Sequence, residues 1–374
     1  MLPRIVLAFL VLAISSAHAQ APQPPAVAAR AWLLMDTASG QVIAAANPDE
    51  RLEPASLTKL MTAYLVFAAL RNKSIALDQT VQVSERAWRA AGSRMFIEPR
   101  KPVTVEELIQ GMVVQSGNDA CIALAELVGG SEDAFASRMN REARRLGMGD
   151  TNFTNASGLP DPKHYSTAHD LALLAAALIR DFPQDYRYYS MREYRYNNIT
   201  QQNRNRLLWL DPNVDGVKTG YTENAGYCLI ASSRRGPRRL LSAVLGTASE
   251  SVRAQESLKL LNFGFQVYDT VKLYSKGQTI SMLEVWKGSE SRLKAGAGAD
   301  LAVTVPKGLA ERIKAELLSQ QPLFAPISAG QRVGTVRVSL DNKLLREYPV
   351  VALESVGAAG MLGRAWDTMR LWFR

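Results

Sequence analysis

The chain has 374 residues, of which 47% are hydrophobic and 21% are charged, and its formal net charge is +9. This length suits two domains, and the apolar content is ample for a buried core. The positive charge suits an anionic partner, such as a lipid surface or a cell-wall polymer. Nucleic acid is excluded as a partner, because no basic segment is interleaved with aromatic residues.

Residues 1–19 have the pattern of a secretory signal peptide. Arg4 supplies the positive charge, residues 5–14 form an apolar run too short to span a bilayer, and Ala17-His18-Ala19 is a small-x-small cleavage site. Loss of this segment removes one charge, that of Arg4, and lowers the formal charge from +9 to +8. We therefore predict an exported protein whose mature chain starts with a flexible Ala/Pro-rich tether, residues 20–30.

A predicted hairpin, with strands at 31–35 and 41–45, precedes the sequence Pro54-Ala55-Ser56-Leu57-Thr58-Lys59. Apolar residues then recur at helical spacing through Leu70, which predicts a largely buried helix. Ser56 and Lys59 are three residues apart, so both lie on one face of its first turn. A hydroxyl beside an amine is the layout of a Ser–Lys nucleophilic pair, whose amine, once neutral, takes the hydroxyl proton. The alternative is an N-capping serine next to a surface lysine.

Capping residues, turn residues and apolar periodicity predict the other elements of the first domain. Thr104 and Glu107 form a capping box that opens a helix through Val114, and Ser116-Gly117-Asn118 breaks the helical pattern. A second capping box, Thr167 with Asp170, opens another helix. The remaining predicted elements are helices at 120–128, 131–146, 167–179 and 250–265, and strands at 226–232 and 240–247 that turn at Arg235-Gly236-Pro237.

From residue 269 the pattern changes to short β-rich runs, which predict a separate, mostly β domain over residues 269–355. Asp341-Asn342 marks a hairpin turn within it. We expect one short helix, at 309–318, and strands at 271–274, 301–305, 333–340 and 348–353. No candidate catalytic residues occur there, so the chemistry is assigned to residues 31–268.

Residues 356–374 predict an amphipathic helix. Met361, Trp366 and Phe373 project on one side of the helical wheel, and Arg364 and Arg374 project on the other. Charges within the segment rule out a comfortable transmembrane span, whereas this distribution suits a helix that lies in the membrane interface. The alternative is a helix docked on its own domain. We favour the membrane, because the segment is terminal and follows the flexible sequence Gly-Ala-Ala-Gly.

The cysteine and histidine content argues against metal chemistry. Cys121 and Cys228 both lie in apolar segments, which favours buried free thiols over a disulfide. His164 and His169 are the histidines of the mature chain, and they are five residues apart without a Cys or His cluster. A zinc site or a Ser-His-Asp triad is therefore not expected. We expect no metal and no cofactor.

Three short motifs occur in order, and each has an ordinary explanation on its own. They are Ser56-Leu57-Thr58-Lys59, Ser116-Gly117-Asn118, which could be a turn, and Lys218-Thr219-Gly220, which could be the start of a strand. Together, in an exported chain, they match the penicillin-recognising serine enzymes. The chain resembles the low-molecular-mass penicillin-binding proteins that are serine-type D-alanyl-D-alanine carboxypeptidases. Other segments that look like this family are 92–96, 115–120, 203–205 and 213–220.

The resemblance implies roles for the residues of the first two motifs. Ser56 would attack the carbonyl between two terminal D-alanines and form an acyl-enzyme. Lys59 would be the base, with its pKa depressed by burial and by the nearby cation Lys218. Ser116 would relay a proton to the leaving D-alanine. Asn118 would hold Lys59 and the substrate amide.

The resemblance also implies how the substrate is bound. Lys218 and Thr219, with Gly220 beside them, would line the opposite wall and bind the terminal carboxylate. The oxyanion would lie between the backbone N–H groups of Ser56 and Tyr221. Tyr221 is a departure, since similar enzymes often carry His at this position. Arg253 resembles a second carboxylate-binding cation, and the alternative for it is a solvated arginine on a helix face.

The resemblance implies an α+β catalytic domain of the penicillin-binding and β-lactamase-like type, an antiparallel sheet flanked by helices. It is followed by the small β-rich domain and the amphipathic helix. The expected partners are peptidoglycan stem peptides ending in D-Ala-D-Ala, β-lactam antibiotics and the periplasmic face of the inner membrane, to which the exported protein would attach peripherally. One alternative is a β-lactamase-type hydrolase, although no Glu-x-x-Leu-Asn occurs. Another is a non-catalytic, membrane-attached wall-binding scaffold.

Overall fold

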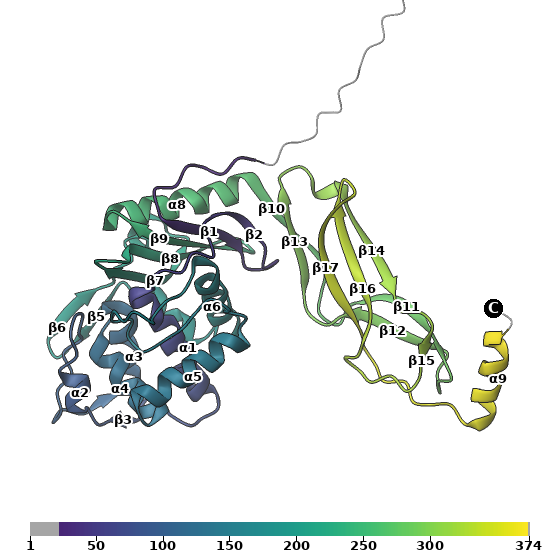
Figure 1. The fold of residues 1–374 in the computed structure, drawn as a ribbon, viewed down its shortest axis with the longest axis horizontal. Coiled ribbons are helices and arrows are strands. Elements are labelled where there is room, and N and C mark those ends of the chain that lie inside the picture. Colours follow the sequence, from purple (N-terminus) through teal and green to yellow (C-terminus); the bar gives the residue numbers. More distant parts are fainter. Residues whose placement is uncertain (1–21, 373–374) are drawn as a thin grey trace, which may run out of the picture.

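The structure, a computed structural model, describes residues 22–372. The predicted signal peptide lies outside the described residues, as do residues 20–21 and 373–374. A helix-rich domain is followed by a β-rich domain, and helix α9, Met361–Trp372, lies at the end of the β-rich domain that is farther from the first domain (Figure 1). In the described part of the chain, no helix is both long enough and apolar enough to cross a bilayer.

An antiparallel sheet of five strands organises the first domain, in the order β2-β1-β9-β8-β7. Its strands are β1 Ala31–Asp36, β2 Val42–Ala46, β7 Val214–Thr222, β8 Gly226–Arg235 and β9 Arg238–Thr247. The predicted hairpin at 31–45 and the predicted strand pair at 226–247 are both confirmed. β7 is an edge strand, so the outer side of its backbone faces the helical part of the domain and not another strand of this sheet.

Helices cover both faces of this sheet. All six residues of β1 are buried, and successive side chains enter different cores, as the twofold repeat of a strand requires. Leu33 belongs to the core that includes helices α1 and α6, whereas Leu34 belongs to the core that includes helix α8. The three helices are α1 Lys59–Arg71, α6 Ala168–Asp181 and α8 Glu250–Val267. The fold is the expected α+β arrangement (Figure 1).

Short elements complete the first domain. Thr104 and Glu107 make the predicted reciprocal capping box. The second predicted box is only half formed: Thr167 accepts from the backbone N–H of Asp170, whose carboxylate binds Thr151 instead. The remaining elements are η1 Ala55–Thr58, β3 Thr80–Val81, α2 Glu85–Trp88, β4 Val103–Thr104, α3 Val105–Gln110, η2 Gly111–Gln115, α4 Asn118–Gly129, α5 Glu132–Arg145, η3 Asp185–Ser190, β5 Glu193–Tyr196, β6 Ile199–Gln202 and α7 Leu207–Leu210.

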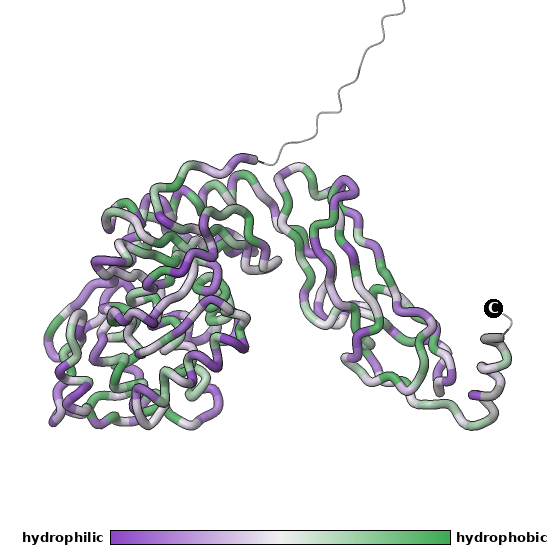
Figure 2. Tube along the Cα trace, in the orientation of Figure 1, coloured by the Kyte–Doolittle hydropathy of each residue, from purple (hydrophilic) through white to green (hydrophobic). Residues whose placement is uncertain are grey.

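The second domain has its own hydrophobic core between a strand pair and a six-stranded sheet. The pair is β10 Tyr268–Tyr274 with β13 Leu301–Pro306. The sheet has the order β14-β16-β17-β12-β11-β15. Figure 2 shows hydrophobic and hydrophilic residues interspersed along these strands, as expected for strands with one buried face. The six strands are β11 Thr279–Trp286, β12 Arg292–Ala297, β14 Ile313–Ser319, β15 Leu323–Phe324, β16 Arg332–Leu340 and β17 Lys343–Ala352.

The prediction of a helix at 309–318 is wrong. Only a short 3₁₀ turn, Ala310–Arg312, forms there, and strand β14 follows it. Each residue from Ile313 to Ser319 pairs with β16 in an unbroken antiparallel register. The Ala, Glu, Lys and Leu residues of this segment are good helix formers, but pairing with the sheet outweighs that local preference.

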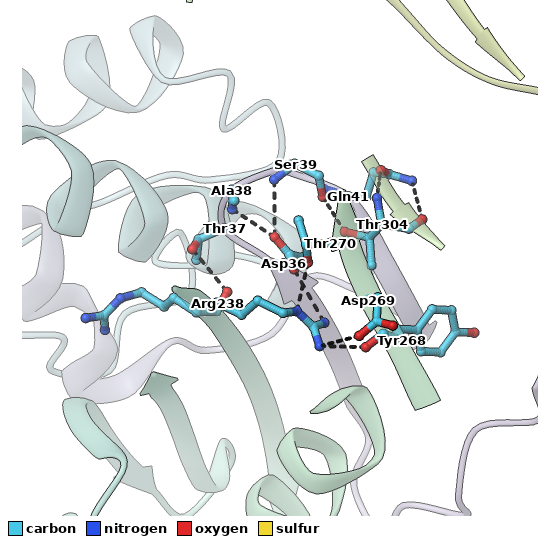
Figure 3. A network of polar contacts seen from close by, with 11 residues as sticks. Asp36, Thr37, Ala38, Ser39, Gln41, Arg238, Tyr268, Asp269, Thr270 and Thr304 are labelled. Atoms are coloured by element: carbon cyan, nitrogen blue, oxygen red, sulfur yellow. Dashed lines mark hydrogen bonds and ion pairs between the residues drawn. The ribbon is translucent and has the colours of Figure 1, made fainter. Parts of the chain in front are cut away.

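Buried polar contacts join the two domains, and Asp36 is the central residue (Figure 3). Its carboxylate is fully buried, accepts a hydrogen bond from the Thr270 hydroxyl and lies 3.7 Å from the Arg238 guanidinium. A second contact joins the hydroxyl oxygens of Ser39 and Thr304 at 2.7 Å. These bonds link the turn after β1 to strands β10 and β13, so the first strand of the helix-rich domain is fixed directly to the second domain.

Both cysteines are buried and free, which confirms that prediction. Burial raises the pKa of the Cys121 thiol to about 12 and that of Cys228 to about 11. Both thiols are therefore protonated at neutral pH and act as small apolar side chains.

Candidate active site

Ser56 lies on the short 3₁₀ turn η1, and Lys59 is the first residue of α1. The sequence predicts one continuous helix here, whereas the structure divides it into a tight turn and the α-helix. Ala55 has a positive φ of 48°, a sparsely populated conformation that redirects the chain just before Ser56. Because of this turn, the Ser56 side chain is half-buried at a cavity wall while Lys59 is only 1% exposed.

The Lys59 amine is surrounded by three oxygen atoms. Its Nζ lies 2.9 Å from Ser56 Oγ, 2.7 Å from Asn118 Oδ1 and 2.6 Å from the carbonyl oxygen of Ser157. The Asn118 and Ser157 oxygens can only accept hydrogen bonds. A neutral amine has two N–H groups and one lone pair, so it can donate to these two oxygens and keep its lone pair directed at the Ser56 hydroxyl.

Burial lowers the pKa of Lys59 to about 8, and the nearby cation Arg204 acts in the same direction. At pH 7 about a tenth of the molecules therefore hold this amine in the neutral form. Burial also holds the pKa of Lys218 well below its ordinary value, and the charges of Lys59 and Arg204 lower it further. The lowered pKa of Lys59 thus makes its neutral form, the form that a base needs, accessible at neutral pH.

Ser116 and Lys218 form a second hydroxyl–amine pair on the opposite wall. Lys218 Nζ lies 2.9 Å from Ser116 Oγ and 3.1 Å from the Thr219 carbonyl oxygen. Ser116 ends the π-helical turn η2 in a left-handed conformation, with φ 67°. Asp119 fixes the adjoining loop, because its buried carboxylate accepts from the backbone N–H groups of Met95 and Phe96 at 3.0 and 2.8 Å.

The edge strand β7 carries Thr219, Gly220 and Tyr221 past the Ser56 turn. A Cβ atom at Gly220 would lie 3.1 Å from the Pro54 carbonyl oxygen, so glycine permits this close approach of strand and turn. Thr219 is buried, whereas Tyr221 is 51% exposed and its ring centroid lies 4.4 Å from that of Tyr227. The Tyr221 side chain therefore forms part of the open rim of the site.

Arg253 is only 3% exposed, which is inconsistent with a solvated arginine on a helix face. It comes from the first turn of α8, and its guanidinium donates to the Gly220 carbonyl oxygen at 3.3 Å. It also pairs with Glu250 at 3.5 Å and lies over the Tyr227 ring, with 5.5 Å to the centroid.

The nine residues predicted from the sequence meet around one cavity of about 340 Å³. Lys59 and Lys218 lie behind its wall, each bonded to a serine hydroxyl. The seven predicted residues that line the cavity itself are Ser56, Ser116, Asn118, Thr219, Gly220, Tyr221 and Arg253.

The structure adds residues to which the sequence analysis assigned no role. Arg204 lines the cavity and donates to the Ser93 hydroxyl at 2.5 Å. It belongs to the Asn203-Arg204-Asn205 segment, whose resemblance to the family could have indicated that Arg204 lies in the site. No sequence pattern could have indicated the carbonyl oxygen of Ser157, because any residue type supplies a backbone carbonyl.

The loop that carries Ser157 is held by His164, for which the sequence predicts no role in a zinc site or a catalytic triad. The His164 ring is 3% exposed, and its Nε2 lies 2.8 Å from the Thr58 hydroxyl. Its Nδ1 accepts from the backbone N–H of Thr154 at 3.1 Å. Burial lowers the pKa of His164 to about 4, so the ring is neutral at pH 7 and joins this loop to the Ser56 turn.

The comparisons with known proteins agree with this geometry. Residues 18–249 match the D-alanyl-D-alanine carboxypeptidase family, and residues 268–358 match the penicillin-binding protein 5 C-terminal domain. D-alanyl-D-alanine carboxypeptidase DacC of Escherichia coli (strain K12) is 44% identical over 376 residues, which cover 98% of this chain and 94% of the relative. The structure of penicillin-binding protein 5 from Haemophilus influenzae has a TM-score of 0.85 at 40% identity, and covers 90% of this chain and 99% of that one.

Penicillin-Binding Protein D2 from Listeria monocytogenes, whose structure was solved in the ampicillin-bound form, is also similar to this chain. It has a TM-score of 0.59 at 32% identity, and the match covers 64% of this chain and 98% of that one.

A helix-flanked antiparallel sheet with paired serines and lysines around one cavity defines a penicillin-recognising serine enzyme. This chain belongs to the D-alanyl-D-alanine carboxypeptidase family, which confirms the resemblance found in the motifs. It is a serine-type D-Ala-D-Ala carboxypeptidase of the penicillin-binding protein 5 type, which binds β-lactams and acts in peptidoglycan remodelling.

Proposed function

We propose that Ser56 is the nucleophile that removes the terminal D-alanine from a peptidoglycan stem peptide. Its Oγ bonds to the carbonyl carbon between the two D-alanines, and the C–N bond of that amide breaks. Water then hydrolyses the resulting ester and regenerates Ser56. The 2.9 Å contact between Ser56 Oγ and Lys59 Nζ is the observation that carries this proposal.

Lys59 is the base in this proposal. It takes the Ser56 proton through the lone pair that remains when its two N–H groups donate to Asn118 and Ser157. The lowered pKa of Lys59 makes this neutral form accessible at neutral pH.

Ser116, bonded to the Lys218 amine, relays to the leaving nitrogen of D-alanine the proton that Lys59 took from Ser56. The contact between Ser116 and Lys218 supports this role, since an amine that donates to the Ser116 oxygen makes the hydroxyl proton easier to release.

The terminal carboxylate of the substrate binds at the cationic end of the cavity. Arg253 provides the positive charge, and the Lys218 amine and the Thr219 hydroxyl provide hydrogen-bond donors. The backbone N–H groups of Ser56 and Tyr221 stabilise the oxyanion, and the position of β7 at the sheet edge supports this, because an edge strand has backbone groups available for a ligand.

Helix α9 attaches the exported protein to the periplasmic face of the inner membrane. Met361, Trp366 and Met369 are 82%, 59% and 49% exposed. The Asp367 carboxylate instead faces the second domain, where it accepts from the backbone N–H of Lys287 at 2.6 Å. An apolar surface of this kind at the end of the molecule supports interfacial binding.

Release of D-alanine from diacetyl-Lys-D-Ala-D-Ala tests the proposed chemistry. The wild-type protein should liberate D-alanine, and Ser56→Ala should not. Ser281→Ala, at a half-buried serine on β11 of the second domain, serves as the matched control. Rapid β-lactam hydrolysis without D-alanine release would identify a β-lactamase-type hydrolase. A wild-type protein inert in both assays would identify a scaffold.

A further inference from the structure

A groove of about 500 Å³ opens beside the active-site cavity. Arg204 and Glu250 line both the cavity and the groove, so the two spaces adjoin each other. The far part of the groove is formed by Arg206 and by Trp209 and Leu210 of helix α7. None of the proposed catalytic steps uses this space.

Glu250 forms the ridge between the cavity and the groove. Its carboxylate lies 3.5 Å from the Arg253 guanidinium on the cavity side and 3.5 Å from that of Arg206 on the groove side. The proposed function places the substrate's terminal carboxylate at Arg253. The groove therefore begins on the side of the residue that leaves, not on the side of the acyl group that stays on Ser56.

The groove has an excess of positive charge. Arg204 and Arg206 both line it, and Glu250 is the single acidic residue among those that do so in the described chain. The Arg204 guanidinium donates to a neutral partner, the Ser93 hydroxyl. An acidic ligand would therefore be attracted to this space.

The groove also has an apolar wall. The neighbouring residues Leu207 and Leu208 of α7 are buried in the core, whereas Trp209 and Leu210 are 44% and 62% exposed. Exposed apolar residues beside a charged rim suit a ligand with a methylene chain that ends in a charged group.

We propose that this groove receives the side chain of the leaving D-residue and favours an acidic one. The inference rests on the proposed function, because it requires the α-carboxylate of that residue at Arg253. The reaction is the same hydrolysis: the amide C–N bond breaks, and the released amine is an acidic D-amino acid in place of D-alanine. The side-chain carboxylate then lies near Arg206, across the Glu250 carboxylate from Arg253.

A substrate series with different leaving residues tests the proposal. In diacetyl-Lys-D-Ala-D-Xaa, the last residue is D-Ala, D-Glu, D-Gln or D-Lys, and kcat/KM is measured from release of that residue. At low ionic strength we expect D-Glu to exceed D-Gln by about threefold or more and D-Lys by about tenfold, which corresponds to about 1.4 kcal/mol. Because exposed charges are screened, the ratio should shrink in high salt.

Variants of Arg206 separate the groove from the general positive charge of the cavity. Arg206→Glu should reverse the D-Glu to D-Lys ratio, and Arg206→Lys should preserve it. Arg337→Glu makes the same change on β16 of the second domain and should leave the ratio at its wild-type value. A change at Arg206 can also affect Arg253, because Glu250 contacts both residues. The value of kcat/KM for the neutral D-Gln substrate measures this indirect effect in each variant.

The outcomes distinguish this inference from the proposed function. Release of D-alanine with a wild-type D-Glu to D-Lys ratio near one would overturn the groove assignment alone. The groove assignment would also be overturned if the Arg206→Glu variant had the same D-Glu to D-Lys ratio as the wild-type protein. Absence of D-alanine release by the wild-type protein would instead overturn the proposed catalytic function, and this inference with it.

Discussion

The Lys59 amine lies 2.9 Å from the Ser56 hydroxyl oxygen, and only 1% of that lysine is exposed. Burial is expensive for an ammonium group, and this cost favours the neutral amine that can accept a proton. The sequence places the two residues on one face of a turn, and the fold provides the burial. The chemistry of the site depends on both.

Replacement of Lys59 by arginine should abolish most of the acylation rate. A guanidinium keeps its positive charge but cannot give up a proton near neutral pH. We expect benzylpenicillin acylation to fall by about two to four orders of magnitude, as for loss of a general base. Stopped-flow or quenched mass spectrometry measures the rate, and thermal unfolding checks that the variant is folded. Acylation within a few-fold of wild type would assign the base to another group.

The pH dependence of acylation should follow the neutral fraction of Lys59. Its pKa is lowered to about 8, and the amine is active when unprotonated. The rate constant should therefore rise about tenfold per pH unit below this value and level off above it. A profile that is flat from about pH 6 to 9 would contradict the role of Lys59.

Gly158 should be intolerant of a side chain. Its φ is +83°, and a Cβ atom there would lie only 1.8 Å from the Ala55 carbonyl oxygen, so Gly158→Ala must displace the turn that carries Ser56. We expect acylation to fall about tenfold or more, as for a small misplacement of a catalytic group.

Gly147→Ala is the matched control for this substitution. Gly147 has the same φ of +83°, but no other atom lies within 4 Å of the place that its Cβ would occupy. The control should therefore carry only the backbone strain, about 1 kcal/mol, and acylate at the wild-type rate. Equal effects of both changes would show that backbone strain, not the contact with Ala55, is responsible.

Helix α9 should bind anionic vesicles. A truncation that removes this helix should begin after Gly360, because Val356 is buried and exchanges backbone hydrogen bonds with Ile327. Deletion of residues 361–374 should therefore abolish co-sedimentation with vesicles and leave D-alanine release nearly unchanged. High salt should release only part of the full chain, since screening weakens the basic contacts and not the apolar ones.

A single substitution provides a milder test of the same helix. Trp366→Ala should weaken vesicle binding several-fold, whereas Trp88→Ala, at an exposed tryptophan of the first domain, should not. If deletion of residues 361–374 unfolded the second domain, the helix would be docked on that domain and not on the membrane.

Much of the fold could be predicted because local signals and tertiary structure agree. Thr104 with Glu107 opens a helix, and Asp341-Asn342, both with positive φ, turns a hairpin. The prediction for the segment from Ile313 to Ser319 failed because its helix-forming residues pair with β16, a partner that its own sequence does not reveal. Strands β11 and β12 were missed for the same reason, since their stability comes from their neighbours in the sheet.

The part of the candidate site that is formed by side chains of short sequence motifs could be predicted. Ser56, Lys59, Ser116 and Lys218 belong to short motifs whose order is informative. The Ser157 carbonyl and the His164 ring act through a loop whose position depends on the whole fold, so no local pattern marks them. Burial, which lowers the pKa of Lys59, is likewise a property of the packed domain.

The central claim is that Ser56 is the acylated nucleophile, and mass spectrometry after incubation with benzylpenicillin tests it most directly. The intact protein should gain one penicilloyl group, and peptide mapping should locate it on Ser56. Ser56→Ala should remain unlabelled under the same conditions. Labelling of Ser56→Ala at the wild-type rate, or an adduct mapped to Ser116, would contradict the account.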